Sequence, residues 1–271
     1  MMIVVKAYRF LNLLSIDIAA GAIACALFFA RLLEVNMRVA AIASLGLTVW
    51  IIYTADHLLD AWKIVGRAST ERHRFHQDHF KVLVCLTILA ILVNAVLIFF
   101  IKRPVLYSGV VIIALIGFYL LIHTRLAFLK EVFVAVLYCV GVLLPSVTVT
   151  QLPLTIVHYL FFLTFLFAAL INLLLFSWFD RTRDKVDGRT SFVTHLGEDI
   201  TVNVLYTLVI LNVVIAAYLG IASSNQAGAM VPLAMTLILA GILHFRGWFT
   251  IGDRYRLLGD AVFLLPFCAV W

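Results

Sequence analysis

Two pairs of aspartates carry the clearest chemical signal in this sequence. Asp56 and Asp60 are four residues apart, and so are Asp180 and Asp184. Residues at this spacing share one face of a helix, where two like charges destabilise it unless a cation lies between them. Carboxylate oxygens suit Mg²⁺, which commonly binds one or two of them together with substrate phosphates. The spacing therefore predicts magnesium sites, and two facing pairs would hold a diphosphate between their ions.

Basic residues follow both aspartate pairs. Diphosphates are bound by Lys and Arg donors as well as by metal ions. The alternative is that these charged residues form ordinary salt bridges in a solvated loop. A binding site is favoured because each of the two aspartate pairs is followed by a basic segment. The residues that we expect to bind a diphosphate are Lys63, Arg67, Arg72, Lys130 and Arg189.

The elements that must position these residues are long apolar helices. The chain is 65% hydrophobic and 13% charged, with a mean hydropathy of +1.12, whereas soluble domains are about half apolar and about a quarter charged. Its apolar runs are near the ~20 residues that a spanning helix needs, and in lipid the backbone must pair within the segment. The sequence thus predicts an all-α polytopic membrane protein, a single bundle of nine transmembrane helices around a central cavity, with one domain over residues 1–271. The expected helices are 12–30, 39–59, 80–100, 104–122, 131–149, 154–178, 201–221, 229–246 and 257–271.

Charge predicts the orientation of this bundle. All but four of the 20 Lys and Arg residues fall on the side that holds the N-terminus. The positive-inside rule makes that side cytoplasmic, and we expect an integral protein of a bacterial-type inner membrane. Both aspartate pairs and both long connections lie on this side, which indicates the working face. Attraction to anionic lipid would explain the net charge of +6, but not the paired aspartates, and we expect no nucleic-acid partner.

The segment "STERHRFHQDHF" places a histidine at every third position. Histidines can bind zinc. However, three histidines at this spacing spread over about 240° around a helix, so their side chains do not converge on one ion. Ser69 or Thr70 fits a helix cap. We expect a short helix over the cavity, with Arg72 and His73 available to a diphosphate; a solvated amphipathic helix is the alternative.

Two further carboxylates fall inside expected membrane helices. Asp17 and Asp260 would make buried polar contacts between the first and last helices, or line the cavity. Intramembrane carboxylates also suit a transporter. However, the sequence shows neither the inverted repeats nor the interrupted helices typical of transporters, and the aspartate pairs lie at helix ends. A transporter or a non-catalytic lipid-binding protein is therefore the less favoured alternative.

The stretch "DRTRDKVDGRTSFVTHLG" resembles a motif of the UbiA superfamily of intramembrane prenyltransferases. That motif often reads D-x-x-G-D-R-x-x-G-K-R-T-L-x-x-x-L-G. Asp180 and Asp184 match its aspartates, Gly188 its glycine and Leu196–Gly197 its ending. The stretch "RFLNLL" also resembles the start of the family's first helix, where an asparagine faces the cavity; here it is Asn12.

Two departures mark the chain as a divergent member. The family's first motif is usually N-D-x-x-D-x-x-x-D, but Ile52 and Tyr53 stand at its first two positions, so one expected metal ligand is missing. The fourth helix of the family often ends with a tyrosine and then a lysine about four residues later. Here Tyr119 is followed by His123, a weaker and titratable substitute.

The resemblance implies a fold, a reaction and a cofactor. It implies transfer of an isoprenyl group from an isoprenyl diphosphate to a lipophilic acceptor, with Mg²⁺ as cofactor. We expect this acceptor to be an aromatic compound. A terpene cyclase with the same ionisation step is the alternative. The implied catalytic residues are Asp56, Asp60, Asp180 and Asp184, which bind metal together with Asp187. The implied cavity residues are Asn12, Tyr53, Tyr119 and His123.

Overall fold

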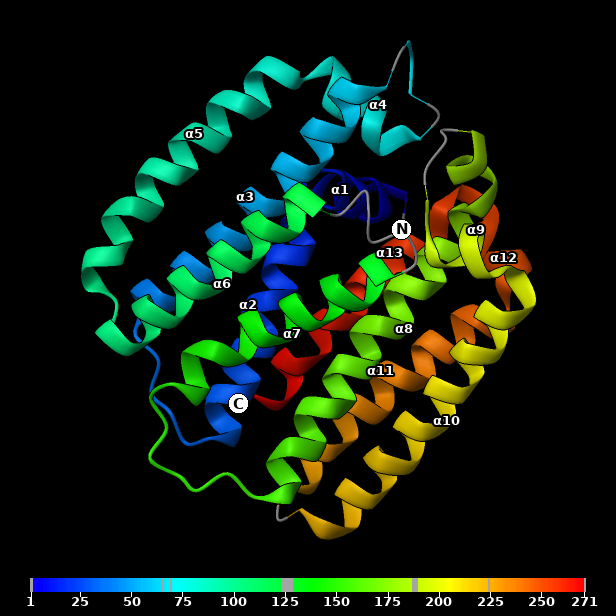
Figure 1. The fold of residues 1–271 in the computed structure, drawn as a ribbon. Coiled ribbons are helices and arrows are strands. Elements are labelled where there is room, and N and C mark those ends of the chain that lie inside the picture. Colours follow the sequence, from blue (N-terminus) through cyan, green and yellow to red (C-terminus); the bar gives the residue numbers. More distant parts are fainter. Residues whose placement is uncertain are drawn as a thin grey trace.

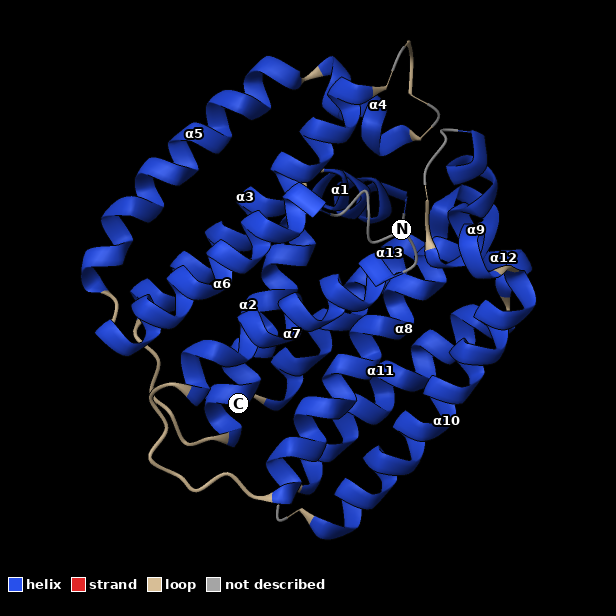
Figure 2. Cartoon of the chain, in the orientation of Figure 1, coloured by secondary structure: helices blue, strands red, loops and turns tan. Residues whose placement is uncertain are grey.

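The computed structural model describes residues 2–64, 66–68, 70–122, 129–186, 190–223 and 225–270. Every regular element in these ranges is a helix (Figure 2). Each of the nine expected helices has a counterpart there, which confirms the predicted all-α class. In chain order they are α2 (Ile16–Leu32), α3 (Val39–Lys63), α5 (Phe80–Leu97), α6 (Arg103–Ile122), α7 (Lys130–Val147), α8 (Ile156–Val186), α10 (Glu198–Ala222), α11 (Gln226–His244) and α13 (Arg254–Ala261), which continues as the 3₁₀ helix η5 (Val262–Ala269).

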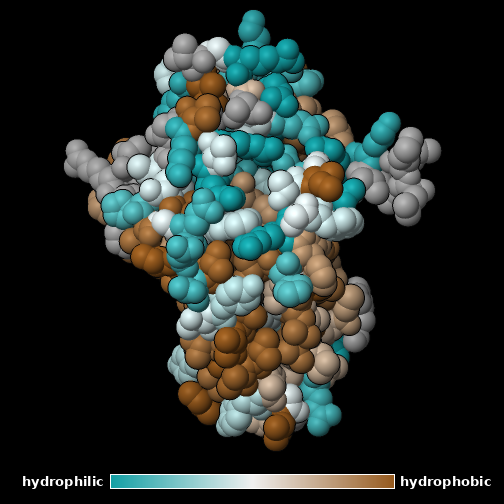
Figure 3. All heavy atoms as spheres, turned by 90° about the vertical axis from the view of Figure 1, so that its right-hand side faces the viewer, coloured by the Kyte–Doolittle hydropathy of each residue, from teal (hydrophilic) through white to brown (hydrophobic). Residues whose placement is uncertain are grey.

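Several of these helices can span a membrane. In the described part of the chain, 6 helices are long and apolar enough to cross a membrane, or up to 7 if one bent pair is a single span. Helix α5 exposes large apolar side chains such as Leu89 and Val96, as expected of a surface that contacts lipid. On the face that carries α10, hydrophilic side chains gather in the upper part and apolar ones below (Figure 3). The protein is an integral membrane protein by fold and composition.

Short helices complete the polar end of the bundle. They are α1 (Met2–Leu13), α4 (Glu71–Asp78), α9 (Phe192–Leu196) and α12 (Arg246–Thr250). The expected helix in "STERHRFHQDHF" is α4, and the hydroxyl of Thr70 caps it by accepting from the backbone N–H of His73 at 3.3 Å. At the start of α9, Ser191 and Thr194 form a capping box. In Figure 1, α4, α9 and α12 lie toward the end where α3 and α8 finish.

Three of the differences from the expected helix boundaries bear on the site. We placed helix ends at residues 59 and 178, where charge begins, but α3 runs to Lys63 and α8 to Val186. Both aspartate pairs therefore lie on the last turns of long helices. One carboxylate of each pair has a partner on another helix, Asp60 beside His73 on α4 and Asp180 with Arg256 on α13, so charge does not terminate the segments. The expected first helix is broken instead: α1 and α2 meet at 82°, because Ser15 adopts a left-handed conformation with φ 55°.

The core lies where α2 packs against α7, α8 and η5. Small residues on α2, including Ala22 and Cys25, are fully buried and allow close helix approach. One turn further along, the ring of Phe29 packs on Phe165 with centroids 4.6 Å apart. The central helix α8 is thereby fixed, and with it the position of its C-terminal aspartates.

Gly21 sets the closest approach between α2 and η5. An added Cβ would lie 2.9 Å from the Cβ of Phe263. Gly21→Ala should therefore lower the free energy of unfolding by about 1–3 kcal/mol, as overpacking does. Gly117→Ala on α6 is the matched control, because nothing lies within 4 Å of its added Cβ. Thermal unfolding in detergent measures both, and equal melting temperatures would contradict the close-packing argument.

Candidate active site

The first aspartate pair lies on the last two turns of α3. Asp56 is half exposed, whereas Asp60 is 28% exposed at its side chain. An imidazole faces each carboxylate: His57 Nδ1 is 3.9 Å from Asp56, and His73 Nε2 is 3.8 Å from Asp60. Both distances exceed hydrogen-bond length, so neither contact is a direct hydrogen bond.

The second pair, on α8, is held differently. Asp180 is 5% exposed, and its Oδ1 accepts from the hydroxyl of Tyr255 at 2.5 Å. Its Oδ2 accepts from the guanidinium of Arg256, and Arg183 Nη1 lies 3.3 Å from Oδ1. A buried charge needs such pairing. Asp184, one turn later, is half-buried.

Helix α4 closes this end of the bundle through Arg72. One guanidinium nitrogen donates to Asn12 Oδ1 at 2.9 Å and lies 3.5 Å from Asp260 Oδ2. The other is 3.4 Å from His57 Nε2. Arginine only donates, so this imidazole nitrogen accepts, and the neutral ring carries its proton on Nδ1, which faces Asp56. Arg72 thus joins α4 to α1, α3 and α13.

A second histidine, on α4 itself, is buried against α3. His76 is 1% exposed, and its ring centroid is 5.1 Å from that of His57. Its Nδ1 is 2.8 Å from the carbonyl of Arg72. Burial lowers the pKa of His76, so its ring is neutral near pH 7. It supports α4 rather than supplying a positive charge.

The two intramembrane carboxylates do meet, as predicted. Asn12 Nδ2 donates to Asp17 Oδ2 at 2.6 Å and to Asp260 Oδ2 at 2.8 Å. The asparagine thereby bridges α1, α2 and α13, and it is 4% exposed. We expected it to face the cavity; it lies instead in this polar network.

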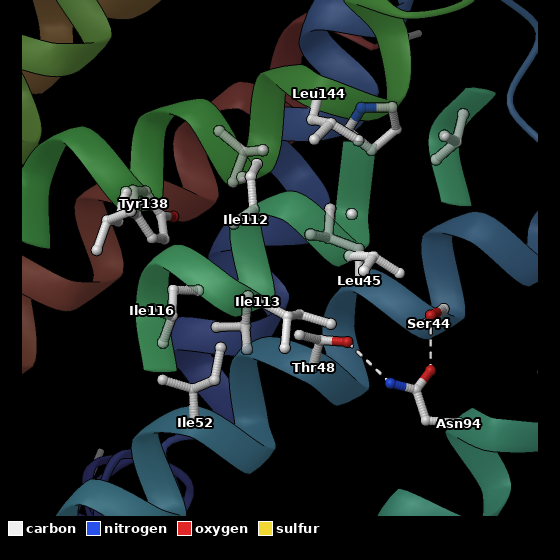
Figure 4. Close-up of a pocket in the computed structure, with 18 of the residues that line it drawn as sticks. Ser44, Leu45, Thr48, Ile52, Asn94, Ile112, Ile113, Ile116, Tyr138 and Leu144 are labelled. Atoms are coloured by element: carbon white, nitrogen blue, oxygen red, sulfur yellow. Dashed lines mark hydrogen bonds between the residues drawn. The ribbon is translucent and has the colours of Figure 1, made fainter. Parts of the chain in front are cut away.

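An apolar cavity of about 280 Å³ opens beside Asp56. Its walls come from α3, α5, α6 and α7 and are mostly aliphatic (Figure 4). Two predicted cavity residues, Tyr53 and Tyr119, line it. On its other side Ser44 and Thr48 hydrogen-bond to Asn94, at 2.6 and 2.8 Å (Figure 4). Among the described residues, the lining includes Asp56 but neither aspartate of α8.

The predicted basic residues are spread over this end. Lys63 and Arg67 are exposed near the end of α3, and Lys130 is half-buried at the start of α7. Arg72 contacts protein groups, as described above. Three predicted site residues lie outside the described residues: His123, Asp187 and Arg189.

The donor set at α3 suits Mg²⁺ better than that at α8. In the part of the chain that the structure describes, no group of three or more His, Cys, Asp or Glu side chains could hold a metal ion. Mg²⁺ needs only one or two protein carboxylates when substrate phosphates and water complete its shell, and Asp56 and Asp60 meet that requirement. Asp180 is less accessible than these two carboxylates, because it is 5% exposed and its oxygens accept from Tyr255 and Arg256 in this arrangement.

Sequence reasoning missed His57, Tyr255 and Arg256. The signals were weak: His57 directly follows Asp56, and Arg256 shares a helical face with Asp260 four residues later. Their importance comes from tertiary partners on α4 and α8.

Comparisons with known proteins give structural likeness only. No family model matches the chain, and no curated protein is similar to it. One similar structure is a UbiA homolog from Archaeoglobus fulgidus bound to DMAPP and Mg²⁺, with a TM-score of 0.62 and 13% identity, covering 96% of this chain and 98% of that chain. Another is a UbiA homolog from the same organism bound to GPP and Mg²⁺, with a TM-score of 0.65 and 14% identity, covering 97% and 99%. This chain therefore has the all-helical membrane fold of the UbiA homologs.

Proposed function

We propose that this protein is a Mg²⁺-dependent intramembrane prenyltransferase of the UbiA superfamily. The observation that carries the proposal is the aspartate pair of α3 beside an apolar cavity, in a fold whose similar structures are bound to DMAPP or GPP and Mg²⁺. The proposal covers residues 1–271 as one domain, with the site on the cytoplasmic side.

The diphosphate would bind at the end of α3. Asp56 and Asp60 would hold Mg²⁺, which stabilises charge on the leaving diphosphate when it is bound. Lys63, Arg67 and Lys130 would donate to phosphate oxygens. Asp184, Asp187, Arg189 and His123 keep their predicted roles, while Asp180 orients α8 through Arg256 in the described arrangement.

The apolar cavity would hold the isoprenyl chain. Its aliphatic walls match a hydrocarbon, and the aromatic rings of Tyr53 and Tyr119 line it along with Asp56. Aromatic faces stabilise cations, so these tyrosines suit an allylic carbocation formed when the carbon–oxygen bond to diphosphate breaks. A lipophilic aromatic acceptor would then attack that carbon. In a terpene cyclase, a double bond of the same chain would attack instead.

Turnover tests the proposal directly. Purified protein in lipid nanodiscs should release diphosphate from at least one isoprenyl diphosphate when Mg²⁺ is present, and chelation should abolish release. Mass spectrometry of the products, with and without an aromatic acceptor, separates transfer from cyclisation. No release from DMAPP, GPP or longer donors under any of these conditions would refute the proposal.

A further inference from the structure

A small pocket with four polar residues in its lining adjoins the apolar cavity. Its volume is about 30 Å³, and its polar lining consists of Tyr53, Tyr138, Asn172 and Asp260. Tyr53, Val134 and Tyr138 line both spaces. These three side chains therefore separate the proposed substrate cavity from the carboxylate of Asp260.

The pocket can hold a small polar molecule such as water. Asn172 is 5% exposed, and its buried Oδ1 has no hydrogen-bond partner among the described residues. Gly259 makes room for this oxygen, because an added Cβ would lie 2.4 Å from it. A water molecule needs a polar space of at least about 10–15 Å³ and two to four polar partners. The pocket meets both conditions for one water.

Two carboxylates lie behind the pocket. Asp260 and Asp17 accept from the same nitrogen of Asn12, at 2.8 and 2.6 Å, and they are 6% and 4% exposed. Tyr8 also donates to Asp17 at 3.1 Å, and the backbone N–H of Ile18 does so at 3.0 Å.

The charges around this pair do not balance. Arg72 lies 3.5 Å from Asp260. Arg256 lies one turn before Asp260 on the same face of α13, and it binds Asp180. With Asp17, Asp180 and Asp260 all ionised, three buried negative charges therefore share the positive charges of Arg72 and Arg256. Arg183 also reaches Asp180, but its side chain is 40% exposed and it pairs with Asp253. Buried groups in this situation neutralise, and neighbouring carboxylates take up one proton between them.

We infer that the Asp17–Asp260 pair is the proton acceptor of the transfer reaction. The inference rests on the proposed function and adds that the acceptor substrate is one that loses a proton. The carbon–oxygen bond of the isoprenyl diphosphate breaks and its electron pair leaves on the diphosphate. A π electron pair of the acceptor forms the new carbon–carbon bond. The acceptor's C–H proton then passes by Tyr53 and a water in the pocket to Asp260, and the C–H electron pair restores the aromatic ring.

Infrared difference spectroscopy tests the pair without any substrate. Wild-type protein should show the carbonyl band of a protonated carboxylic acid at a pH at which an isolated aspartate is already ionised. Asp260→Asn should remove this band. Asp17→Asn should remove it too, because Arg72 then neutralises the remaining carboxylate. Asp199→Asn, at an exposed position on α10, should keep it. A wild type without the band, or a band that persists in both variants, would overturn the inference.

A kinetic test separates this inference from the proposed function. In Asp260→Asn, formation of the prenylated product should fall about 10²–10⁴-fold, the usual contribution of a general base, and more than diphosphate release does. Its pH profile should lose the limb on which product formation rises with pH. Equal losses of product and diphosphate release would overturn the inference. Absence of diphosphate release in the wild type would instead refute the proposed function. The infrared experiment needs no substrate, so it would still test protonation of the Asp17–Asp260 pair.

Discussion

Asp56→Asn should lower kcat for diphosphate release by about 10²–10³-fold, the loss seen when one stabilising group of a transition state is removed. Asp56 lines the apolar cavity and lies one turn before Asp60 on the same face of α3. Asparagine keeps the size of the side chain but removes the charge that a hard cation requires. The concentration of Mg²⁺ needed for half-maximal activity should rise in parallel.

The fold of this variant should survive, which makes the kinetic loss interpretable. Removing one of two like charges four residues apart relieves repulsion in α3, so the melting temperature should stay constant or rise slightly. Asp78→Asn is the matched control, because Asp78 is exposed at the end of α4 and should keep wild-type kinetics. Unchanged kcat and Mg²⁺ dependence in Asp56→Asn would exclude α3 as the metal-binding helix.

The sequence was sufficient for the class of fold and for the first aspartate pair. Long apolar runs permit only helices in lipid, and four-residue spacing puts Asp56 and Asp60 on one face wherever the helix lies. The same local reasoning found α4, because a cap and its helix are adjacent in the chain. It failed where the outcome depends on distant residues. Hydropathy ended the helix before Asp180, but Tyr255 and Arg256 bind that carboxylate and α8 continues to Val186.

The contact between Asp17 and Asp260 also combines a part that the sequence predicts with a part that depends on distant residues. Their presence in apolar segments predicted a polar contact between the first and last helices, and Asn12 makes that contact. The bend at Ser15, which brings Asn12 beside them, has no sequence signature because serine seldom adopts the left-handed conformation. The sequence could therefore predict which residues meet, but not the single side chain that joins them.

Arg256→Gln should be the most destabilising of the charge-removing substitutions. Asp180 is 5% exposed, and without Arg256 its buried charge keeps Tyr255 and the more exposed Arg183 as its partners among the described residues. Breaking a buried ion pair from one side costs about 3–5 kcal/mol, because the other charge is left uncompensated. Urea or thermal unfolding in detergent should show this loss. Arg183→Gln is the control: its side chain is 40% exposed, and exposed pairs contribute about 0–1 kcal/mol.

The double variant Asp180→Asn with Arg256→Gln decides what Asp180 does. If its carboxylate serves mainly to pair with Arg256, removing both charges should recover most of the stability that Arg256→Gln loses, and Mg²⁺ should not stabilise the single variant. If Asp180 can bind a metal, as the motif "DRTRD" predicts, Mg²⁺ should replace the missing guanidinium and restore stability to Arg256→Gln alone. We expect the first result, because Tyr255 and Arg256 approach both oxygens of Asp180 from α13, which leaves the α3 pair as the principal metal-binding carboxylates of the proposed site.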